Sequence, residues 1–203
     1  MNQFIVQIYK KKNAASKKTV FVDRDGTLLK DPSEEKKLEF LPGILEGLKK
    51  LNKNKVTIIV ITNQPAIAKG KTTISKVKSI HNDLINQLRK KGGYINAVYF
   101  CPHHPEKNHT DIPLFARKYR IECECRKPKL AMFKKAVEDF NINLKSSYII
   151  GDRTADIKAG ENLGIETILV KTGHKGEDKT YPISPNFISD NFNHAADIII
   201  RNL

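Results

Sequence analysis

The stretch TVFVDRDGT, residues 19–27, joins a short strand-forming run to two aspartates and a glycine. The run TVFV holds only β-branched and aromatic side chains, which favour a β-strand. Because the run does not alternate between apolar and polar residues, it predicts a strand covered on both faces, as in parallel sheets. The aspartates would then lie at the carboxyl end of this strand, where open α/β sheets bind their ligands.

Similar runs recur along the chain, and helical patterns separate them. Further strands are predicted at 56–61, 95–100, 147–150, 166–170 and 196–200. Apolar residues at helical spacing predict helices over 43–53, 73–93, 129–140 and 155–164. The alternation of strand and helix indicates an α/β fold of the Rossmann-like, doubly wound kind, with a mostly parallel sheet and helices on both faces.

Two segments stand outside this alternation. Residues 1–17 are predicted as an N-terminal extension, in which FIVQIY adds an edge strand and the lysine-rich stretch after it forms a basic linker. Residues 101–128 show no clear helix or strand, and a loop of this length inside a compact domain needs a physical explanation. We therefore expect one principal domain over 18–203 that includes this loop.

Composition limits the class of protein. The chain has 203 residues, 39% hydrophobic and 29% charged, so a globular domain with a sizeable core is expected. No apolar run approaches the roughly 20 residues that a membrane helix needs. The opening MNQFIVQIYKKK has too short an apolar region for a secretory signal, and its basic residues follow that region. Three cysteines cannot all pair within one chain, so a cytoplasmic protein is expected.

The formal charge of +14 allows two interpretations. Lysines on solvated surfaces account for it without any function. Alternatively, the charge serves an anionic partner, either a phosphorylated metabolite or a nucleic acid. The lysines are spread along the whole chain, which does not favour a single nucleic-acid-binding tract.

Asp23 and Asp25 are the first candidates for chemistry. At strand spacing their side chains would point to the same face, and Gly26 permits a tight turn whose backbone amides can hold an anion. Two close carboxylates also attract a hard divalent cation. In one interpretation, Asp23 attacks phosphorus and forms an aspartyl-phosphate, while Asp25 protonates the leaving alcohol and later activates water. The alternative is an Asx-type turn at the strand end.

Polar residues in two later segments could hold the transferring phosphoryl group. Thr62 follows a predicted strand, with the amides of Asn63 and Gln64 beside it, and its hydroxyl could bond a phosphoryl oxygen. Lys127 offers a point charge for the same group, and Arg126 a planar fork for a second anion. The alternatives are a helix N-cap at Thr62 and a solvated basic pair at 126–127.

The segment GDRTAD, residues 151–156, supplies two more carboxylates after a predicted strand. Asp152 would be a third acidic ligand for the cation, and Asp156 would orient a neighbouring ligand or lysine. The alternative for Asp156 is a helix N-terminal charge that interacts with the helix dipole.

The long loop carries all three cysteines of the chain. Cys101, His103, Cys123 and Cys125 form a Cys-x-His and a Cys-x-Cys pair, and three thiolates with one imidazole suit a closed tetrahedral Zn²⁺ site. Since protein ligands would fill all four positions, this zinc would be structural. The alternatives are thiols buried as small apolar groups, or His104 as the ligand instead of His103; His109 is a spare candidate.

Together, these segments resemble the haloacid dehalogenase superfamily of phosphohydrolases. DRDGT, TNQ, Lys127 and GDRTAD match its four ordered motifs. The longer stretches FVDRDGTL, TNQPAIAKG, CPHHP, CECRKP and GDRTADIKAG resemble the family of D-glycero-D-manno-heptose 1,7-bisphosphate phosphatases, with a likeness over about residues 18–172. The sister histidinol-phosphate phosphatase domains share much of this pattern, and nucleic-acid 3′-phosphatases share the core but do not characteristically carry the zinc loop.

The resemblance implies roles for individual residues. It implies Asp23 as nucleophile, Asp25 as general acid and base, and stabilisation of the phosphoryl group by Thr62 and Lys127. It implies Mg²⁺ held by Asp23, Asp152 and a backbone oxygen of Asp25. The residues expected to contact the substrate are Arg24, Asn63, Gln64, Arg126 and Arg153. It further implies no large cap domain, a zinc-ordered loop in its place, and a small sugar phosphate as substrate. We expect a monomer without membrane or nucleic-acid partners.

Overall fold

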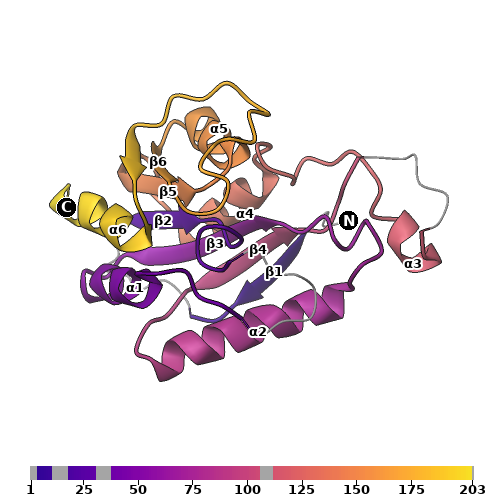
Figure 1. Ribbon diagram of the computed structural model, residues 1–203, viewed down its shortest axis with the longest axis horizontal. Coiled ribbons are helices and arrows are strands. Elements are labelled where there is room, and N and C mark those ends of the chain that lie inside the picture. Colours follow the sequence, from indigo (N-terminus) through magenta and orange to yellow (C-terminus); the bar gives the residue numbers. More distant parts are fainter. Residues whose placement is uncertain (1–3, 11–17, 31–37, 106–111, 203) are drawn as a thin grey trace.

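The computed structural model describes residues 4–10, 18–30, 38–105 and 112–202. Within these ranges a seven-stranded sheet forms the centre of the molecule, in the order β1-β4-β3-β2-β5-β6-β7 (Figure 1). Its strands are β1 (Ile5–Ile8), β2 (Thr19–Val22), β3 (Thr57–Asn63), β4 (Ala97–Cys101), β5 (Ser147–Gly151), β6 (Glu166–Val170) and β7 (Phe187–Ser189). All neighbours pair in parallel except β1, which runs antiparallel to β4 at one edge.

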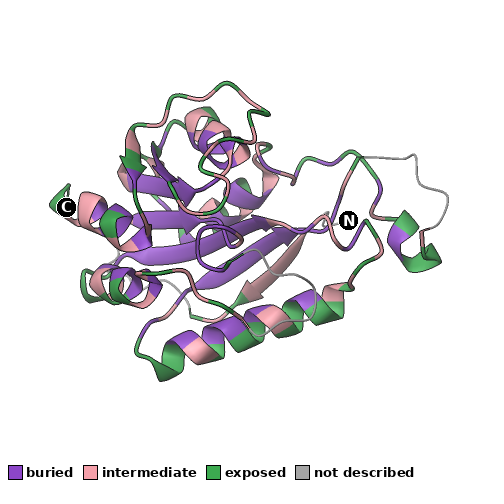
Figure 2. Cartoon of the chain, in the orientation of Figure 1, coloured by how far each residue is buried: buried purple, intermediate pink, exposed green. Residues whose placement is uncertain are grey.

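Helices cover both faces of the sheet. They are α1 (Ile44–Lys53), α2 (Ile74–Lys90), α3 (Leu114–Arg117), α4 (Ala131–Phe140), α5 (Thr154–Leu163) and α6 (Phe192–Arg201), with a 3₁₀ turn, η1, at Leu144–Ser146. Alternate residues of β2 face opposite sides: Val20 and Val22 belong to the core under α1, α2 and α6, whereas Phe21 packs on Phe133 of α4. The inner strands β2 to β6 are accordingly buried on both faces almost throughout, whereas the edge strands β1 and β7 are partly exposed (Figure 2). This burial explains the non-alternating apolar runs.

The order of the strands brings three loops together. From the central strand β2 the chain moves outward through β3 and β4, then returns to β5 beside β2 and moves out through β6 and β7. The sheet therefore reverses direction between β2 and β5, and a ligand-binding crevice is expected at the carboxyl ends of the strands there. The predicted mostly parallel, doubly wound α/β fold is confirmed.

One predicted strand is wrong. Residues 196–200 belong to helix α6, in which Phe192, Ala195, Ala196 and Ile199 are buried along one face at helical spacing. The Asn191 side chain caps this helix by accepting a hydrogen bond from the backbone N–H of His194 at 3.0 Å. A short apolar run does not distinguish strand from helix, and here the cap decides. The last strand is instead β7, which the sequence patterns did not indicate.

The structure describes only parts of the two segments that stand outside the alternation of strand and helix. Residues 5–8 form the edge strand β1, while the basic linker predicted after it falls mostly at 11–17, outside the described residues. Within the described part of the 101–128 loop, α3 is a single helical turn, and His109 lies outside that part. No inserted cap domain covers the strand ends in the described ranges, and no helix there is long and apolar enough to span a bilayer.

Candidate active site

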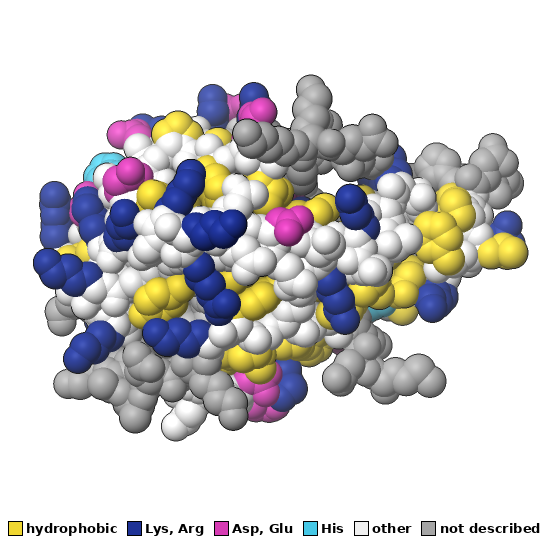
Figure 3. Space-filling model, turned by 90° about the horizontal axis from the view of Figure 1, so that it is seen from below, with side chains coloured by type: hydrophobic (Ala, Val, Ile, Leu, Met, Phe, Trp, Pro, Cys, Tyr) yellow, Lys and Arg dark blue, Asp and Glu magenta, His cyan; other side chains and the backbone are white. Residues whose placement is uncertain are grey.

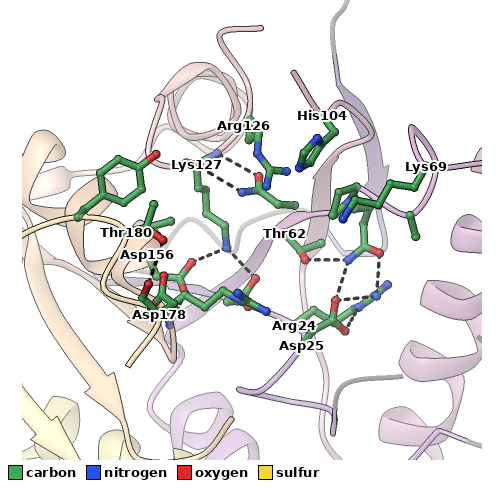
Figure 4. A pocket seen from close by; sticks show the side chains of 18 of the residues that line it. Arg24, Asp25, Thr62, Lys69, His104, Arg126, Lys127, Asp156, Asp178 and Thr180 are labelled. Carbon is green, nitrogen blue, oxygen red and sulfur yellow. Dashed lines mark hydrogen bonds and ion pairs between the residues drawn. The ribbon is translucent and has the colours of Figure 1, made fainter. Parts of the chain in front are cut away.

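A cavity of about 880 Å³ opens at the carboxyl ends of the central strands (Figure 4). It gathers residues from the loops after β2, β3 and β5 and from the long loop before α4. Its lining includes nine of the predicted site residues: Asp23, Arg24, Asp25, Thr62, Asn63, Gln64, Arg126, Lys127 and Arg153. Asp152 is fully buried and does not reach the cavity surface.

Lys127 is the cation at the bottom of this cavity. Its ammonium donates to Asp23 Oδ1, to Asp156 Oδ1 and to the backbone oxygen of Ile61, each at 2.6 Å. Burial alone would lower the pKa of Lys127, but the charges of Asp156 and Asp23 outweigh burial and raise it. The lysine therefore stays charged, and each of its three N–H groups donates to one of these acceptors.

Two buried carboxylates, those of Asp23 and Asp156, contact this ammonium, and a third, that of Asp152, lies beside them. Oxygen atoms of Asp23, Asp152 and Asp156 lie within 4.8 Å of one another. Burial raises the pKa of Asp23 to about 6, although the Lys127 charge opposes the shift. Burial, with the charges of Asp23 and Asp156, raises the pKa of Asp152 to about 8. An all-oxygen donor set with surplus negative charge suits a hard cation such as Mg²⁺, so these residues fit the magnesium ion that the sequence predicts.

The chain after β6 closes around Asp152, and sequence patterns did not single out this segment. The backbone N–H of His174 donates to Asp152 Oδ2 at 2.7 Å, and the Thr172 hydroxyl donates to the backbone oxygen of Gly26 at 2.7 Å. A Cβ at Gly173, whose φ is +57°, would lie 2.2 Å from Asp152 Oδ2. Only glycine fits at this position. The turn Thr172–Gly173–His174 packs against Asp152 and holds it through the hydrogen bond from His174.

We predict that Gly173→Ala weakens Mg²⁺ binding. The added methyl group must displace Asp152, and disturbing the supports of a metal ligand typically lowers metal affinity about 10- to 100-fold. Activity measured against Mg²⁺ concentration should show that increase in the half-maximal concentration. Gly164→Ala is the matched control, since its φ is +67° but nothing lies within 4 Å of its Cβ position. Equal Mg²⁺ dependence of the two variants would contradict the prediction.

Hydrogen bonds from Arg24 and Gln64 fix the orientation of the Asp25 carboxylate. Arg24 donates to Asp25 Oδ1 from Nε at 2.7 Å and to Oδ2 from Nη2 at 2.8 Å. Gln64 Nε2 donates to Asp25 Oδ2 at 2.9 Å and to Thr62 Oγ1 at 3.0 Å, while its Oε1 accepts from Arg24. Because Thr62 Oγ1 accepts from Gln64, its own hydrogen is left to donate toward the cavity. Arg24 and Gln64, which the sequence predicts to contact the substrate, thus contact Asp25 and also line the cavity.

Asn63 connects β3 to the long loop. Its Oδ1 accepts from the backbone N–H of Lys127 at 3.0 Å, and its Nδ2 donates to the Lys127 carbonyl at 3.3 Å. This paired contact fixes the backbone from which the Lys127 side chain extends. Asn63 therefore has a positioning contact in addition to its place in the cavity lining.

A second cluster lies behind Arg126 and Lys127. Sγ atoms of Cys101, Cys123 and Cys125 lie 3.0, 3.4 and 3.6 Å apart. His103 Nδ1 is 3.6 Å from Cys101 Sγ and 3.3 Å from Cys125 Sγ. A tetrahedral zinc with Zn–S bonds of about 2.3 Å places its sulfurs about 3.8 Å apart. The three sulfur atoms and the His103 nitrogen therefore lie near the corners of such a tetrahedron, somewhat closer together than in a metal-bound site. The group contains His103 rather than His104.

The surroundings of these thiols also call for a cation. All four residues are buried, and hydrogen bonding to Cys101, together with burial, raises the pKa of Cys123 to about 12. Thiolates would not persist there without a positive charge to offset them. The donor set thus fits zinc, and Arg126 Nη1 donates to the carbonyl of His103 at 3.3 Å, which connects the cluster to the cavity.

The remaining cavity walls were not predicted in full. Lys69, His104 and Arg126 lie along one side of the cavity, and Asp178 and Thr180 along the other (Figure 4). The Asp178 carboxylate accepts from the backbone N–H of Thr154 at 2.9 Å and from its hydroxyl at 2.7 Å, which ties the segment after β6 to the start of α5. A contact between residues 24 positions apart leaves no local pattern in the sequence.

Comparison with known proteins agrees with this geometry. Residues 124–195 match the family described as HAD-hydrolase-like. A D-glycero-beta-D-manno-heptose-1,7-bisphosphate 7-phosphatase of Haemophilus ducreyi is 35% identical over 162 residues, which cover 77% of this chain and 85% of that protein. A D-glycero-alpha-D-manno-heptose-1,7-bisphosphate 7-phosphatase of Photorhabdus laumondii is 35% identical over 167 residues, 80% of this chain and 87% of that protein.

The fold likeness extends to solved structures. The D,D-heptose 1,7-bisphosphate phosphatase of B. bronchiseptica, complexed with magnesium and phosphate, has a TM-score of 0.76 at 24% identity, covering 92% of this chain and 99% of that one. At 24% identity this likeness shows the fold alone, whereas the relatives at 35% identity show the family. The chain therefore belongs to the heptose-1,7-bisphosphate 7-phosphatase family of haloacid dehalogenase-like hydrolases, and it is a phosphatase.

Proposed function

We propose that this phosphatase is a magnesium-dependent phosphomonoesterase that acts through an aspartyl-phosphate. We propose that it removes the 7-phosphate of D-glycero-D-manno-heptose 1,7-bisphosphate or of a related sugar bisphosphate. The observation that carries the proposal is the contact between Asp23 and the Lys127 ammonium at the bottom of an open cavity. A carboxylate that faces a buried cation beneath a substrate-sized opening is arranged to attack an anionic group.

In the first step, a carboxylate oxygen of Asp23 bonds to phosphorus while the bond from phosphorus to the sugar oxygen breaks. Asp25 gives its proton to that oxygen, so that the sugar leaves as an alcohol. Lys127, charged and held by Asp156 and the Ile61 carbonyl, can turn its third N–H from Asp23 to a phosphoryl oxygen. The Thr62 hydroxyl donates to another phosphoryl oxygen.

In the second step, water attacks the phosphorus of the aspartyl-phosphate. Asp25, now a carboxylate, takes the water's proton, the phosphorus–Asp23 bond breaks, and phosphate leaves. Gln64 and Arg24 keep the Asp25 carboxylate in one orientation through both steps, since each donates to it. Asp23 and Asp152, with a backbone oxygen of Asp25, would hold the magnesium ion, which when bound supplies positive charge that offsets the charge of the phosphoryl group.

The rim of the cavity supports a substrate with a second anionic group. Arg126, His104 and Lys69 lie together on one side, away from the Asp23–Lys127 contact (Figure 4). A guanidinium binds phosphate with two parallel hydrogen bonds, and the Arg126 fork is anchored on the His103 carbonyl. A bisphosphate would place one phosphate at the bottom of the cavity and the other at this rim, with the sugar between them.

The face that carries α2 gives no support to nucleic-acid binding. On the face that carries α2, Lys and Arg side chains are scattered among other groups and do not form a continuous tract (Figure 3). Such single cations are typical of solvated surfaces. We further propose a cytoplasmic monomer, with a phosphatase domain over 18–203 and residues 1–17 as an extension of it.

A substrate comparison tests the proposal. Purified protein with Mg²⁺ would be assayed for phosphate release from both anomers of the heptose 1,7-bisphosphate, from histidinol phosphate and from a 3′-phosphorylated DNA oligonucleotide. One or both heptose bisphosphate anomers should give a kcat/KM at least about tenfold above the others, because they offer Arg126 and Lys69 a second phosphate one sugar ring away from the first. Release only from histidinol phosphate, or only from DNA, would overturn the heptose assignment. Activity unchanged by Mg²⁺ removal would overturn the metal dependence.

A further inference from the structure

A chain of hydrogen bonds leads from the edge strand β1 to Asp25, and its central bond, between His81 and Arg24, is buried. His81 lies on the inner face of α2 and is fully buried. Its Nε2 lies 2.8 Å from Arg24 Nη1, and its Nδ1 lies 2.9 Å from Oε1 of Gln7, a residue of β1. The ring of His81 also packs edge-on against Phe100 at 5.1 Å between centroids. A buried imidazole thus lies between the N-terminal strand and the cavity arginine.

The partners of His81 fix its protonation. A guanidinium can only donate hydrogen bonds, so His81 Nε2 must be the acceptor of the contact with Arg24. The ring proton is therefore on Nδ1, which donates to Gln7 Oε1. A protonated ring would place two cations in contact, and burial together with the Arg24 charge lowers the pKa of His81 well below its ordinary value. The imidazole is neutral and in a single tautomer.

The amide of Gln7 is oriented in turn. Its Nε2 donates to the carbonyl of Lys78 at 3.2 Å and to Asn82 Oδ1 at 3.1 Å, which leaves Oε1 for His81. The Tyr9 hydroxyl donates to the same Asn82 oxygen at 2.9 Å. Residues of the N-terminal segment and of α2 therefore share one hydrogen-bond network. Its bonds orient the Gln7 amide so that Oε1 faces His81.

At the other end, the network leaves one part of Asp25 open. A carboxylate offers about four acceptor sites, and Arg24 and Gln64 take three of them: one on Oδ1 and two on Oδ2. The remaining site is on Oδ1. The Asp25 side chain is 20% exposed, whereas that of Arg24 is 3% exposed, so the open site belongs to the member that reaches the cavity.

We propose that Gln7 and His81 are positioning residues that hold the Arg24 guanidinium on Asp25, so that Asp25 presents Oδ1 as the atom that gives and takes the proton. This inference rests on the proposed function of Asp25. The contribution of the N-terminal extension then follows: β1 supplies the residue that sets the tautomer of His81, and through it the orientation of the acid.

Two substitutions of His81 separate its two contacts. Glutamine places an acceptor near the position of Nε2 and can still receive the Arg24 hydrogen bond, whereas leucine fills the space without an acceptor. Since a general acid typically contributes about 10²- to 10⁴-fold, His81→Leu should slow the first turnover of an alkyl phosphate by about tenfold or more. His81→Gln should recover most of that loss. His194→Leu, on the exposed surface of α6, is the control for the same chemical change.

The leaving group distinguishes positioning from a general structural defect. Nitrophenolate leaves without needing a proton, so the burst of 4-nitrophenol from 4-nitrophenyl phosphate should change less than about threefold in His81→Leu. Rapid-quench measurement of both first turnovers gives the comparison. Equal loss with both substrates, or no loss with the alkyl phosphate, would overturn the proposal. Gln7→Leu should show the same selectivity with a smaller loss, and it serves if His81→Leu does not fold.

The wild-type protein offers a test that needs no variant. With ¹⁵N-labelled histidine, the chemical shifts of the His81 ring nitrogens should be those of the neutral Nδ1–H tautomer, and a protonated ring or the Nε2–H tautomer would overturn the proposal.

The alkyl phosphate of the kinetic test is whichever alkyl phosphate the wild type hydrolyses. Failure to act on heptose bisphosphate therefore counts against the proposed substrate, whereas the leaving-group comparison on another phosphomonoester still decides the role of His81.

Discussion

Asp23→Asn should lower phosphatase turnover by at least about 10⁴-fold, since it removes the nucleophile and an amide oxygen cannot form the aspartyl-phosphate. The substitution keeps the size of the side chain and its oxygen beside Lys127, where Asp23 Oδ1 now accepts at 2.6 Å. It also removes one negative charge from a cluster of three buried carboxylates, two of which contact the Lys127 ammonium. We therefore expect a melting temperature no lower than that of the wild type, so the loss of activity is not a loss of fold.

The measurement combines steady-state phosphate release with mass spectrometry of acid-quenched protein. Wild type mixed with substrate should show the added mass of a phosphoryl group on the peptide that contains Asp23, and the variant should not. Asp83→Asn, the same change at an exposed position of α2, is the matched control and should keep full activity. Retention of more than about 1% of activity by Asp23→Asn would contradict the assignment of the nucleophile.

The central part of the fold could be predicted because its signals are local. The strand over 19–22 was predicted with the bounds that the structure gives to β2, and the amphipathic pattern over 43–53 matches α1 within one residue. The sequence also predicts that Asp23, Thr62 and Asp152 lie at one edge of the sheet, because each of them follows a predicted strand. That inference needs only a parallel sheet with ordinary connections, because the carboxyl ends of neighbouring strands then lie together.

Prediction failed where tertiary contacts decide. The run ADIII has the composition of a strand, but its helical neighbours Phe192 and Ala195 bury the same face as Ile199. Gln7 and His81 carry no motif, and they meet only because β1 pairs with β4 beside α2. The residues after β6 that hold Asp152 lacked a recognisable pattern for the same reason. A lone buried histidine is visible in a sequence only as a polar residue on an apolar helix face.

The proposed zinc site and the proposed phosphoryl contact of Lys127 depend on one short segment. Cys125 is bound into the cluster, Arg126 donates to the carbonyl of His103, and Lys127 reaches Asp23 two residues later. A bound metal removes freedom from the loop before substrate arrives, so that freedom need not be lost on binding. Asn63 fixes the same backbone from β3, so Lys127 would have two supports, of which the proposed zinc is one.

Cys125→Ser should therefore impair catalysis without abolishing it. Loss of a ligand should reduce the zinc content below the one ion per chain expected for the wild type. Because Asn63 still holds the Lys127 backbone, kcat should fall about 10- to 100-fold, the range typical for lost support of a site, and KM should rise as Arg126 moves. Metal analysis and kinetics with excess Mg²⁺ measure both effects, and a zinc-selective chelator should reproduce them in the wild type. Glu124→Gln, exposed between the two cysteines, is the control; zinc loss with unchanged kcat and KM would refute the coupling.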